Sequence, residues 1–476
     1  MVDAREQFTE HSRGKQLHAD QRKQDPEQEQ GALADVMPKR ELFEGQPPLL
    51  LNPSQSSIQG YTNIGGAGAE YFPFGPTSLA RQMAWPYMQQ WHLDVQRELS
   101  RGTLVTVAYV GSKGTHLPLQ YDANQLQPVP ASQNPFAPGQ PLTANNCNND
   151  TAPNGAPITG QALINLTVAC GYQGALAGNI PVLDNGNVDA DLLRTNFPGF
   201  STVTRLATVA SSSYNALQVS GRRTVGSLEL TLAYTYSHSI DNSSDRYDST
   251  FVNSYDLAAS RASSNFDQRH ILTISYIYDL PLFRHATGKT KTFLGGWQLS
   301  GITSMQTGVP VTVANGTIYD NAGVANGDGD GSYEDIVGNP HAAVPASEKF
   351  ESGVVGPLLY NPGAYVSPQG LTFGDSGRNS LYLPRRTNFD MGLFKRFAIG
   401  ESKAFEFRAE AFNIFNHPQW LNIDSTADCG LGATLTPGNP ACVQGSGADG
   451  TFASDFLHPT WTHDPRIMQF GLKFIF

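Results

Sequence analysis

The sequence predicts an all-β fold, an antiparallel up-and-down transmembrane β-barrel with long external loops. Three observations predict it: segments of alternating apolar and polar side chains, connections that are short and long in turn, and an aromatic last residue, Phe476. The segments are close to the length of a tilted strand that crosses a bilayer, about 9–11 residues. Short turns at one rim and long loops at the other are the usual form of an outer-membrane barrel.

Nine segments carry the two-residue period of a strand with one apolar face. In chain order, the expected strands are 91–99, 103–111, 213–223, 227–241, 269–280, 295–308, 387–397, 403–416 and 464–476. The alternation is clearest in 227–241, where Leu228, Leu230 and Leu232 alternate with Glu229, Thr231 and Ala233. Comparable apolar rows contain Leu93 and Val95 in the first, Val105 and Val107 in the second, Leu272 and Ile274 in the fifth, Trp297 and Leu299 in the sixth, and Phe470 and Leu472 in the last.

The connections between these segments alternate in length. "SRG", "TVG" and "AIGES" are tight, and "PLFRHATGKTKTFLGG" is moderate. Long connections follow Gly111, Asp241, Gly308 and Asn416. Because unstructured loops beyond about 15 residues are uncommon in compact domains, this alternation favours a membrane barrel. The last strand then runs toward the rim with the short turns.

The apolar side of each strand could face either lipid or a second protein layer, as in a soluble sandwich. Aromatic residues near the strand ends favour lipid, because interfacial girdles of barrels consist of such residues. They are Trp91, Tyr109, Tyr234, Tyr236, Trp297 and Phe397. A closed barrel also removes the open edges that long strands would expose.

The end of the chain has a pattern of its own. Gln469, Gly471, Phe474 and Phe476 match a polar-x-Gly-x-x-apolar-x-apolar ending, which resembles the signal read by the barrel-insertion machinery. The alternative is an ordinary amphipathic terminal strand.

The composition agrees with a β-rich chain and excludes some classes of function. Charged residues make up 15 % of the 476 residues, against roughly 25 % in globular proteins. The 47 glycines and 31 prolines supply turn residues. A net charge of -11 argues against nucleic-acid binding.

Several phrases together resemble one family. "PYMQQWHLDVQREL", "NFDQRHILTISYIYDLP", "FGDSGRNSLYLP" and "FEFRAEAFNIFNHPQW" occur in the order found in TonB-dependent receptors of the Oar-like kind, which often carry a carboxypeptidase-regulatory-like domain. The resemblance covers residues 85–476 and implies a barrel of about 22 strands, a plug and a segment that engages TonB.

The chain departs from that family pattern at its N-terminal side. Residues 1–30 have no apolar core of a signal peptide, and no plug is recognisable. Nine strands would also place the first and last in parallel, which an up-and-down barrel avoids. We therefore expect a polar segment at 1–84 and the C-terminal part of a larger barrel at 85–476. The expected partners are outer-membrane lipid, the insertion machinery, an unidentified ligand, and TonB only if a plug is supplied elsewhere.

Two groups of residues suggest sites in the loops. Asp328, Asp330 and Asp335 lie among glycines and could supply oxygen ligands to calcium, although the twelfth position of an EF-hand loop counted from Asn326 is not Glu. The alternative is a solvated acidic loop. Cys147, Cys170, Cys429 and Cys442 fit no zinc spacing and suggest loop disulfides, with free thiols as the alternative.

No catalytic constellation stands out, so we expect no enzyme activity. His238 and Asp241 lie near serines, but no GxSxG elbow is present. Asp267 and Arg269 in "FDQRH" suggest ion partners in the lumen or loops, with substrate contact as the alternative.

The predicted function is TonB-dependent uptake of an unidentified ligand, captured by the long loops and passed through a polar lumen. The alternatives are a surface adhesin or binding protein that transports nothing, and a soluble secreted carbohydrate-binding β-sandwich. Solubility without detergent would favour the sandwich.

Overall fold

The structure is a computed structural model that describes most of the chain from residue 76 onward. The described residues are 76–142, 144–169, 194, 196–197, 200, 202–248, 250, 253–314, 324, 332–344, 355–399, 403–427 and 456–476. All of them belong to the unit Pro53–Phe476.

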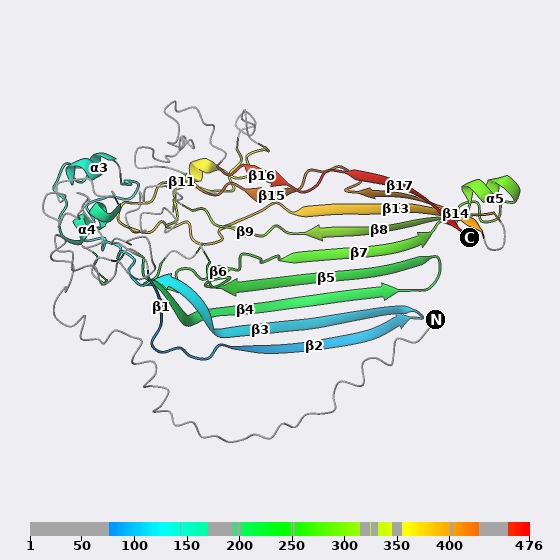
Figure 1. The fold of residues 1–476 in the computed structure, drawn as a ribbon, viewed down its shortest axis with the longest axis horizontal. Coiled ribbons are helices and arrows are strands. Elements are labelled where there is room, and N and C mark those ends of the chain that lie inside the picture. Colours follow the sequence, from blue (N-terminus) through cyan, green and yellow to red (C-terminus); the bar gives the residue numbers. More distant parts are fainter. Residues whose placement is uncertain are drawn as a thin grey trace, which may run out of the picture. The chain divides into compact units, whose positions relative to one another are not determined.

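Nine long strands form one antiparallel sheet in which each strand pairs with its neighbours along the chain (Figure 1). They are β2 (Tyr87–Ser100), β3 (Thr103–Asp122), β4 (Thr204–Arg223), β5 (Leu228–Asp241), β7 (His270–Asp279), β8 (Trp297–Gln306), β13 (Arg386–Ala398), β14 (Ala404–Phe412) and β17 (Ile467–Ile475). The short strand β1 (Thr77–Leu79) pairs with β4, and β6 (Ala262–Ser263) pairs with β5. The nine strands expected from the sequence are thus present, with β2 and β17 at the two edges.

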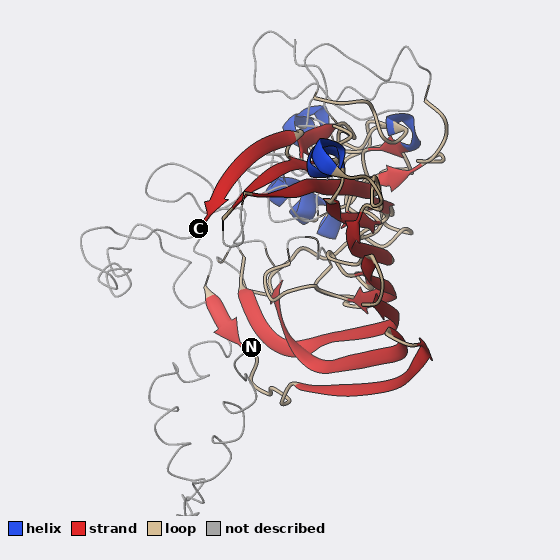
Figure 2. Cartoon of the chain, turned by 90° about the vertical axis from the view of Figure 1, so that its right-hand side faces the viewer, coloured by secondary structure: helices blue, strands red, loops and turns tan. Residues whose placement is uncertain are grey.

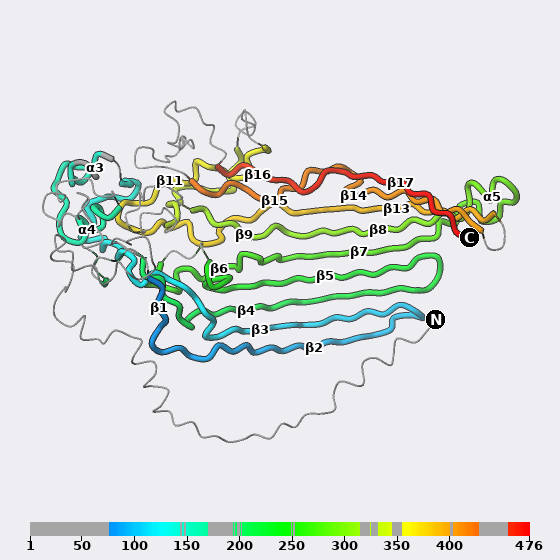
Figure 3. The backbone as a smooth tube through the Cα atoms, viewed as in Figure 1, coloured from blue at the N-terminus to red at the C-terminus, as the bar shows by residue number. Residues whose placement is uncertain are grey.

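The short connections lie at one end of the strands and the long ones at the other (Figure 3). Helix α5 (Gly288–Leu294) lies in the connection between β7 and β8, at the end where β17 finishes. The expected polarity is therefore confirmed. The sheet is curved rather than flat (Figure 2).

Strands β3 and β4 are longer than the sequence suggested. The expected ends were Gly111 and Ser213, but Thr115–Asp122 pairs with Thr204–Ser211 and continues the hairpin. A bulge at His116, whose φ is 56°, interrupts the alternation that would have revealed this extension. At about 3.3 Å per residue, these strands are longer than an apolar membrane band requires.

The long connections form small sheets and helices of their own. Strand β9 (Pro310–Val311) pairs with β12 (Leu381–Tyr382), β10 (Asp335–Ile336) with β11 (Tyr365–Val366), and β15 (Trp420–Ile423) with β16 (Pro459–Thr462). Helices α3 (Ala144–Asn149), α4 (Gly160–Ala169) and the 3₁₀ helix η5 (Pro362–Ala364) complete this region. We call it the loop body.

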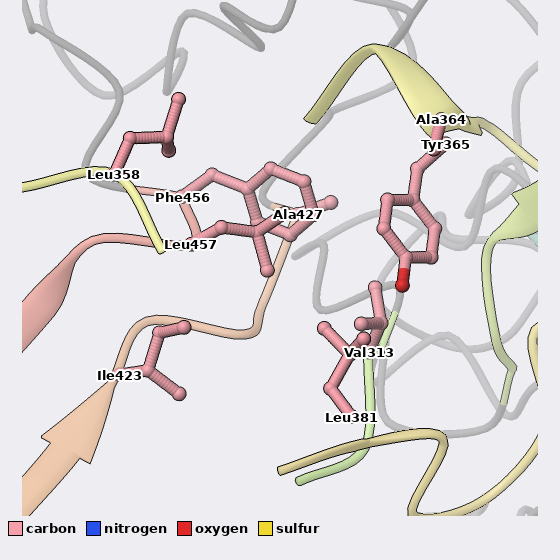
Figure 4. Packing of buried hydrophobic residues seen from close by; sticks show 9 residues of the cluster. All are labelled: Val313, Leu358, Ala364, Tyr365, Leu381, Ile423, Ala427, Phe456 and Leu457. Atoms are coloured by element: carbon pink, nitrogen blue, oxygen red, sulfur yellow. The ribbon is translucent and has the colours of Figure 1, made fainter. Parts of the chain in front are cut away.

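The two large clusters of buried apolar residues lie in the loop body. One cluster joins the β8–β13 and β14–β17 connections and contains Val313, Leu358, Ala364, Tyr365, Leu381, Ile423, Ala427, Phe456 and Leu457 (Figure 4). A second cluster contains Val129, Phe136, Leu142, Ala152, Ile158, Ala162, Leu166, Ala169 and Leu371. Because Leu371 comes from the β8–β13 connection, this cluster joins that connection to the one between β3 and β4.

The long strands keep large apolar side chains exposed. Leu93 on β2 and Phe470 and Leu472 on β17 are each 69 % exposed. Within the part of the chain that the structure describes, no helix has the length and apolar character needed to cross a membrane.

Candidate functional site

The face of the sheet opposite the apolar rows carries polar groups that meet across strands. On this face, Glu406 of β14 lies opposite Arg396 of β13 and Lys473 of β17. Two pairs further along the same face, Gln469 Nε2 donates a hydrogen bond to Glu410 Oε2. Opposite charges that face each other across strands are favourable, and such a face suits the aqueous lumen of a barrel.

The four residues of the proposed insertion signal lie on β17 and directly after it. Gln469 and Gly471 are on the polar face, opposite Glu410 and Arg408. Phe474 is on the apolar face, where its ring lies 5.0 Å from that of Phe405 and 6.0 Å from that of Phe476. The structure therefore shows the expected alternation, while recognition by the machinery stays a prediction.

A buried arginine connects two of the long connections. Arg378, in the β8–β13 connection, donates from Nη1 to Asp241 Oδ1 and from Nη2 to Asp248 Oδ2, each at 2.8 Å. Nη2 also donates to Asn265 Oδ1 at 2.9 Å, and Nε donates to Thr250 Oγ1 at 2.7 Å. We call these five residues the Arg378 network.

The charged side chains of the Arg378 network are buried, and each forms ion pairs or hydrogen bonds within it. The side chains of Arg378, Asp241 and Asp248 are 0 %, 3 % and 1 % exposed. Burial alone would raise the pKa of Asp248. However, hydrogen bonds from the Ser244 and Thr250 groups and the charge of Arg378 outweigh that effect and lower its pKa. Because a buried charge without its partner is costly, the network holds the β8–β13 connection against the β5–β7 connection.

The acidic segment that suggested calcium is only partly within the described residues. Asp328 and Asp330 lie outside them. Asp335, in β10, accepts hydrogen bonds from the backbone N–H groups of Gln369 at 2.9 Å and Asp375 at 3.2 Å. Among the described residues, no group of three acidic, histidine or cysteine side chains is placed to hold a metal ion. The calcium site therefore stays a prediction.

Glu334, next to Asp335, is an unusual group in the loop body. It is 0 % exposed, and neither of its carboxylate oxygens has a hydrogen-bond partner among the described residues. Burial, and then the charge of Asp335, raise its pKa well above the ordinary value. This carboxyl therefore favours its neutral form, because burial and the charge of Asp335 both disfavour the carboxylate.

The cysteines, His238 and Asp241, which the sequence also suggested, do not form one site among the described residues. Cys147 belongs to helix α3, whereas Cys170, Cys429 and Cys442 lie outside the described residues, so the proposed disulfides stay a prediction. His238 Nε2 lies 2.9 Å from Arg269 Nη2, whereas Asp241 binds Arg378.

Arg269 also forms the expected ion pair, with its Nε 2.8 Å from Asp267 Oδ2. Arg378 lies in "FGDSGRNSLYLP", a phrase with no local signal for an ion pair. Its partner Asp241 is 137 residues away in the chain, so no local pattern could connect them.

Two comparisons with known proteins gave matches. A family model described as "Outer membrane beta barrel domain" matches residues 24–468. A solved structure, the outer membrane transporter YddB from Escherichia coli, is similar with a TM-score of 0.33 and 9 % identity, over 74 % of this chain and 32 % of that chain. The chain thus spans about a third of the length of that transporter. No curated protein sequence matches the chain.

Proposed function

The chain belongs to the outer membrane β-barrel family, and from this premise we propose that it serves in TonB-dependent uptake, as part of a receptor of the Oar-like kind. It lies in the cell outer membrane, with its exposed apolar rows toward lipid. The proposal includes capture of an unidentified ligand by the loop body and passage along the polar face of the sheet. Insertion by the barrel machinery, and energy from TonB where a plug is supplied elsewhere, belong to the same proposal.

The observation that carries the proposal is the arrangement of the sheet. Its two faces differ in polarity, and only one of its ends carries the loop body. One face is apolar and exposed, the opposite face has rows such as Arg396, Glu406 and Lys473, and the long connections form a packed body at one end. Loops held on a rigid scaffold are where binding residues concentrate. A polar lumen below such a body suits a receptor that moves its ligand inward.

The strand directions support a larger barrel. Strands β2 and β17 both run toward the end with the short connections, because the nine long strands follow one another in antiparallel order. Pairing these two edges directly would be parallel, whereas bacterial outer-membrane barrels have an even number of antiparallel strands. Closure therefore requires an odd number of further strands. This agrees with the proposal that the sheet is one part of a receptor barrel.

The test compares uptake in cells with the intact gene, with the gene deleted, and with the TonB system deleted. Growth medium is followed by untargeted mass spectrometry, so that no ligand need be chosen beforehand. We expect at least one compound to disappear from the medium of the first strain and to remain with the other two. A surface adhesin would bind material without depleting it, and depletion that persists without the TonB system would contradict the energised mechanism.

A further inference from the structure

A cleft of about 420 Å³ lies where β7, β8 and β13 meet the long connections. The residues that line it are Arg269, His270, Thr307, Gly308, Tyr382, Leu383 and Arg385. Two of the lining residues are arginines, and guanidinium groups are donors well suited to an anion.

The cleft opens on the apolar face of the sheet. His270 begins the row that continues through Leu272 and Ile274, because alternate residues of a strand share a face. The His270 ring lies 4.9 Å from that of Tyr236, and its Nδ1 lies 2.9 Å from Tyr234 Oη. The cleft therefore lies next to Tyr234 and Tyr236, on the side nearer the loop body.

Arg269 is held on the same side of the sheet. Its Nη2 lies 2.9 Å from Nε2 of His238, which shares a face of β5 with Tyr234 and Tyr236. The ion pair with Asp267 fixes the other side of the guanidinium, and the Arg269 side chain keeps 33 % exposure. Its orientation is therefore set before any ligand arrives, which lowers the entropy cost of binding.

Arg385 supplies a free charge. It is exposed, and it forms no hydrogen bond or ion pair with any other described residue. Since Asp267 already compensates Arg269, the cleft retains the positive charge of Arg385. Guanidinium groups bind phosphate through two parallel hydrogen bonds, which a lysine cannot reproduce.

In a membrane barrel, the aromatic girdle marks the depth of the lipid headgroups, and the end with the long loops is external. A basic cleft directly outside the tyrosines, on the lipid side, meets headgroups of the outer leaflet rather than solute in the lumen. We propose that this cleft binds the phosphate of an outer-leaflet lipid and so fixes the barrel against its surrounding lipid. This role is independent of ligand uptake.

The experiment uses the full chain in detergent and measures binding of lipid A, a phosphorylated glycolipid, by native mass spectrometry. Arg385→Gln is the test variant. Arg284→Gln is the matched control, because Arg284 is an exposed arginine in the β7–β8 connection, at the other end of the strands. We expect about tenfold weaker binding for Arg385→Gln, a factor typical of one lost charge-assisted hydrogen bond, and an unchanged affinity for the control. Arg385→Lys should fall between them.

Two further arms decide the source of the phosphate. Dephosphorylated lipid A should bind the unmodified chain as weakly as lipid A binds Arg385→Gln. Inorganic phosphate at the same concentration should not compete. Three results would each overturn the proposal. They are equal binding of lipid A and dephosphorylated lipid A to the unmodified chain, equal binding of lipid A to Arg385→Gln and Arg284→Gln, and full competition by inorganic phosphate. Circular dichroism confirms that the variants are folded.

Discussion

The nine-stranded sheet and the loop body place their apolar residues in opposite ways. In the sheet, Leu93 and Phe470 are each 69 % exposed, whereas Leu166, Leu371 and Leu457 in the loop body are 0 % exposed. Both arrangements remove apolar surface from water, because the sheet lies in lipid and the loop body lies outside it. The exposure of these residues thus reflects the medium around each region.

Polar groups show the same contrast. In the loop body, the fully buried Arg378 is compensated by two aspartates. On the sheet, charged groups such as Glu406 and Lys473 meet on the face opposite the lipid. A charge is therefore tolerated in the loop body by pairing and in the sheet by facing water. The four predictions below test these two rules, starting with the largest effect.

Replacing the buried arginine should disrupt the loop body most strongly. Arg378→Met leaves Asp241 and Asp248 buried without their partner, and we expect a loss of about 3–5 kcal/mol in the stability of the long connections. Limited proteolysis of the protein in outer-membrane vesicles measures this, since cleavage in the connections should accelerate.

The control for this change is Arg261→Met. Arg261 is exposed, and its Nη atoms reach Ser211 and Ser213 only at 3.4 and 3.5 Å. Exposed contacts of this kind contribute little, so cleavage should stay at the level of the unmodified protein. Equal protease sensitivity of the two variants would show that the Arg378 network does not hold the connections together.

A charge on each face of one strand tests the rule for the sheet. Ile274 lies on the apolar face of β7, opposite Leu232, and its neighbour Thr273 lies on the polar face, opposite Ala233. Ile274→Arg should cost about 2–4 kcal/mol near the bilayer centre, whereas Thr273→Arg should cost little. Urea unfolding in lipid vesicles, followed by tryptophan fluorescence, gives both values. Equal costs would mean that the apolar face does not meet lipid.

The sequence predicted the sheet much better than the loop body. Alternation along β5, from Leu228 to Ser237, is a local signal, and lipid on one face keeps it regular. The His116 bulge breaks that signal, which is why the extensions of β3 and β4 were missed. The Arg378 network depends on contacts between residues more than 100 positions apart, and the pairing of Leu371 with the β3–β4 connection does too. No periodicity encodes such contacts.

Glu334 provides a second test within the loop body. Replacing it should stabilise the connections, whereas replacing Arg378 should destabilise them. A carboxyl whose pKa is raised by folding stabilises the protein most below its unfolded pKa, and that contribution is lost as the pH rises. Glu334→Gln should therefore stabilise the connections at pH 8 by about 1–3 kcal/mol, because an amide carries no charge to be neutralised. Protease resistance compared at pH 5 and pH 8 should show a smaller pH dependence in the variant.

The exposed Glu229 on β5 supplies the matched control, and Glu229→Gln should change neither value. Calcium would reverse the result. If the acidic segment with Asp328, Asp330 and Asp335 holds this ion and Glu334 contributes, Glu334→Gln would weaken the connections and a chelator would have the same effect on the unmodified protein. Stabilisation that is insensitive to chelator would support a neutral buried carboxyl.

The smallest expected change in stability concerns the last residue. Phe476 is 90 % exposed at the end of the apolar face, so Phe476→Ala should cost only the transfer of one side chain at the rim, about 1 kcal/mol, once the protein is inserted. If the residue is part of the insertion signal, however, the amount of folded protein in the outer membrane should fall several-fold. Phe293→Ala in helix α5 is the control, since Phe293 is 59 % exposed at the same end of the sheet. Equal yields for the two variants would mean that the terminal phenylalanine serves the sheet only as another apolar side chain facing lipid.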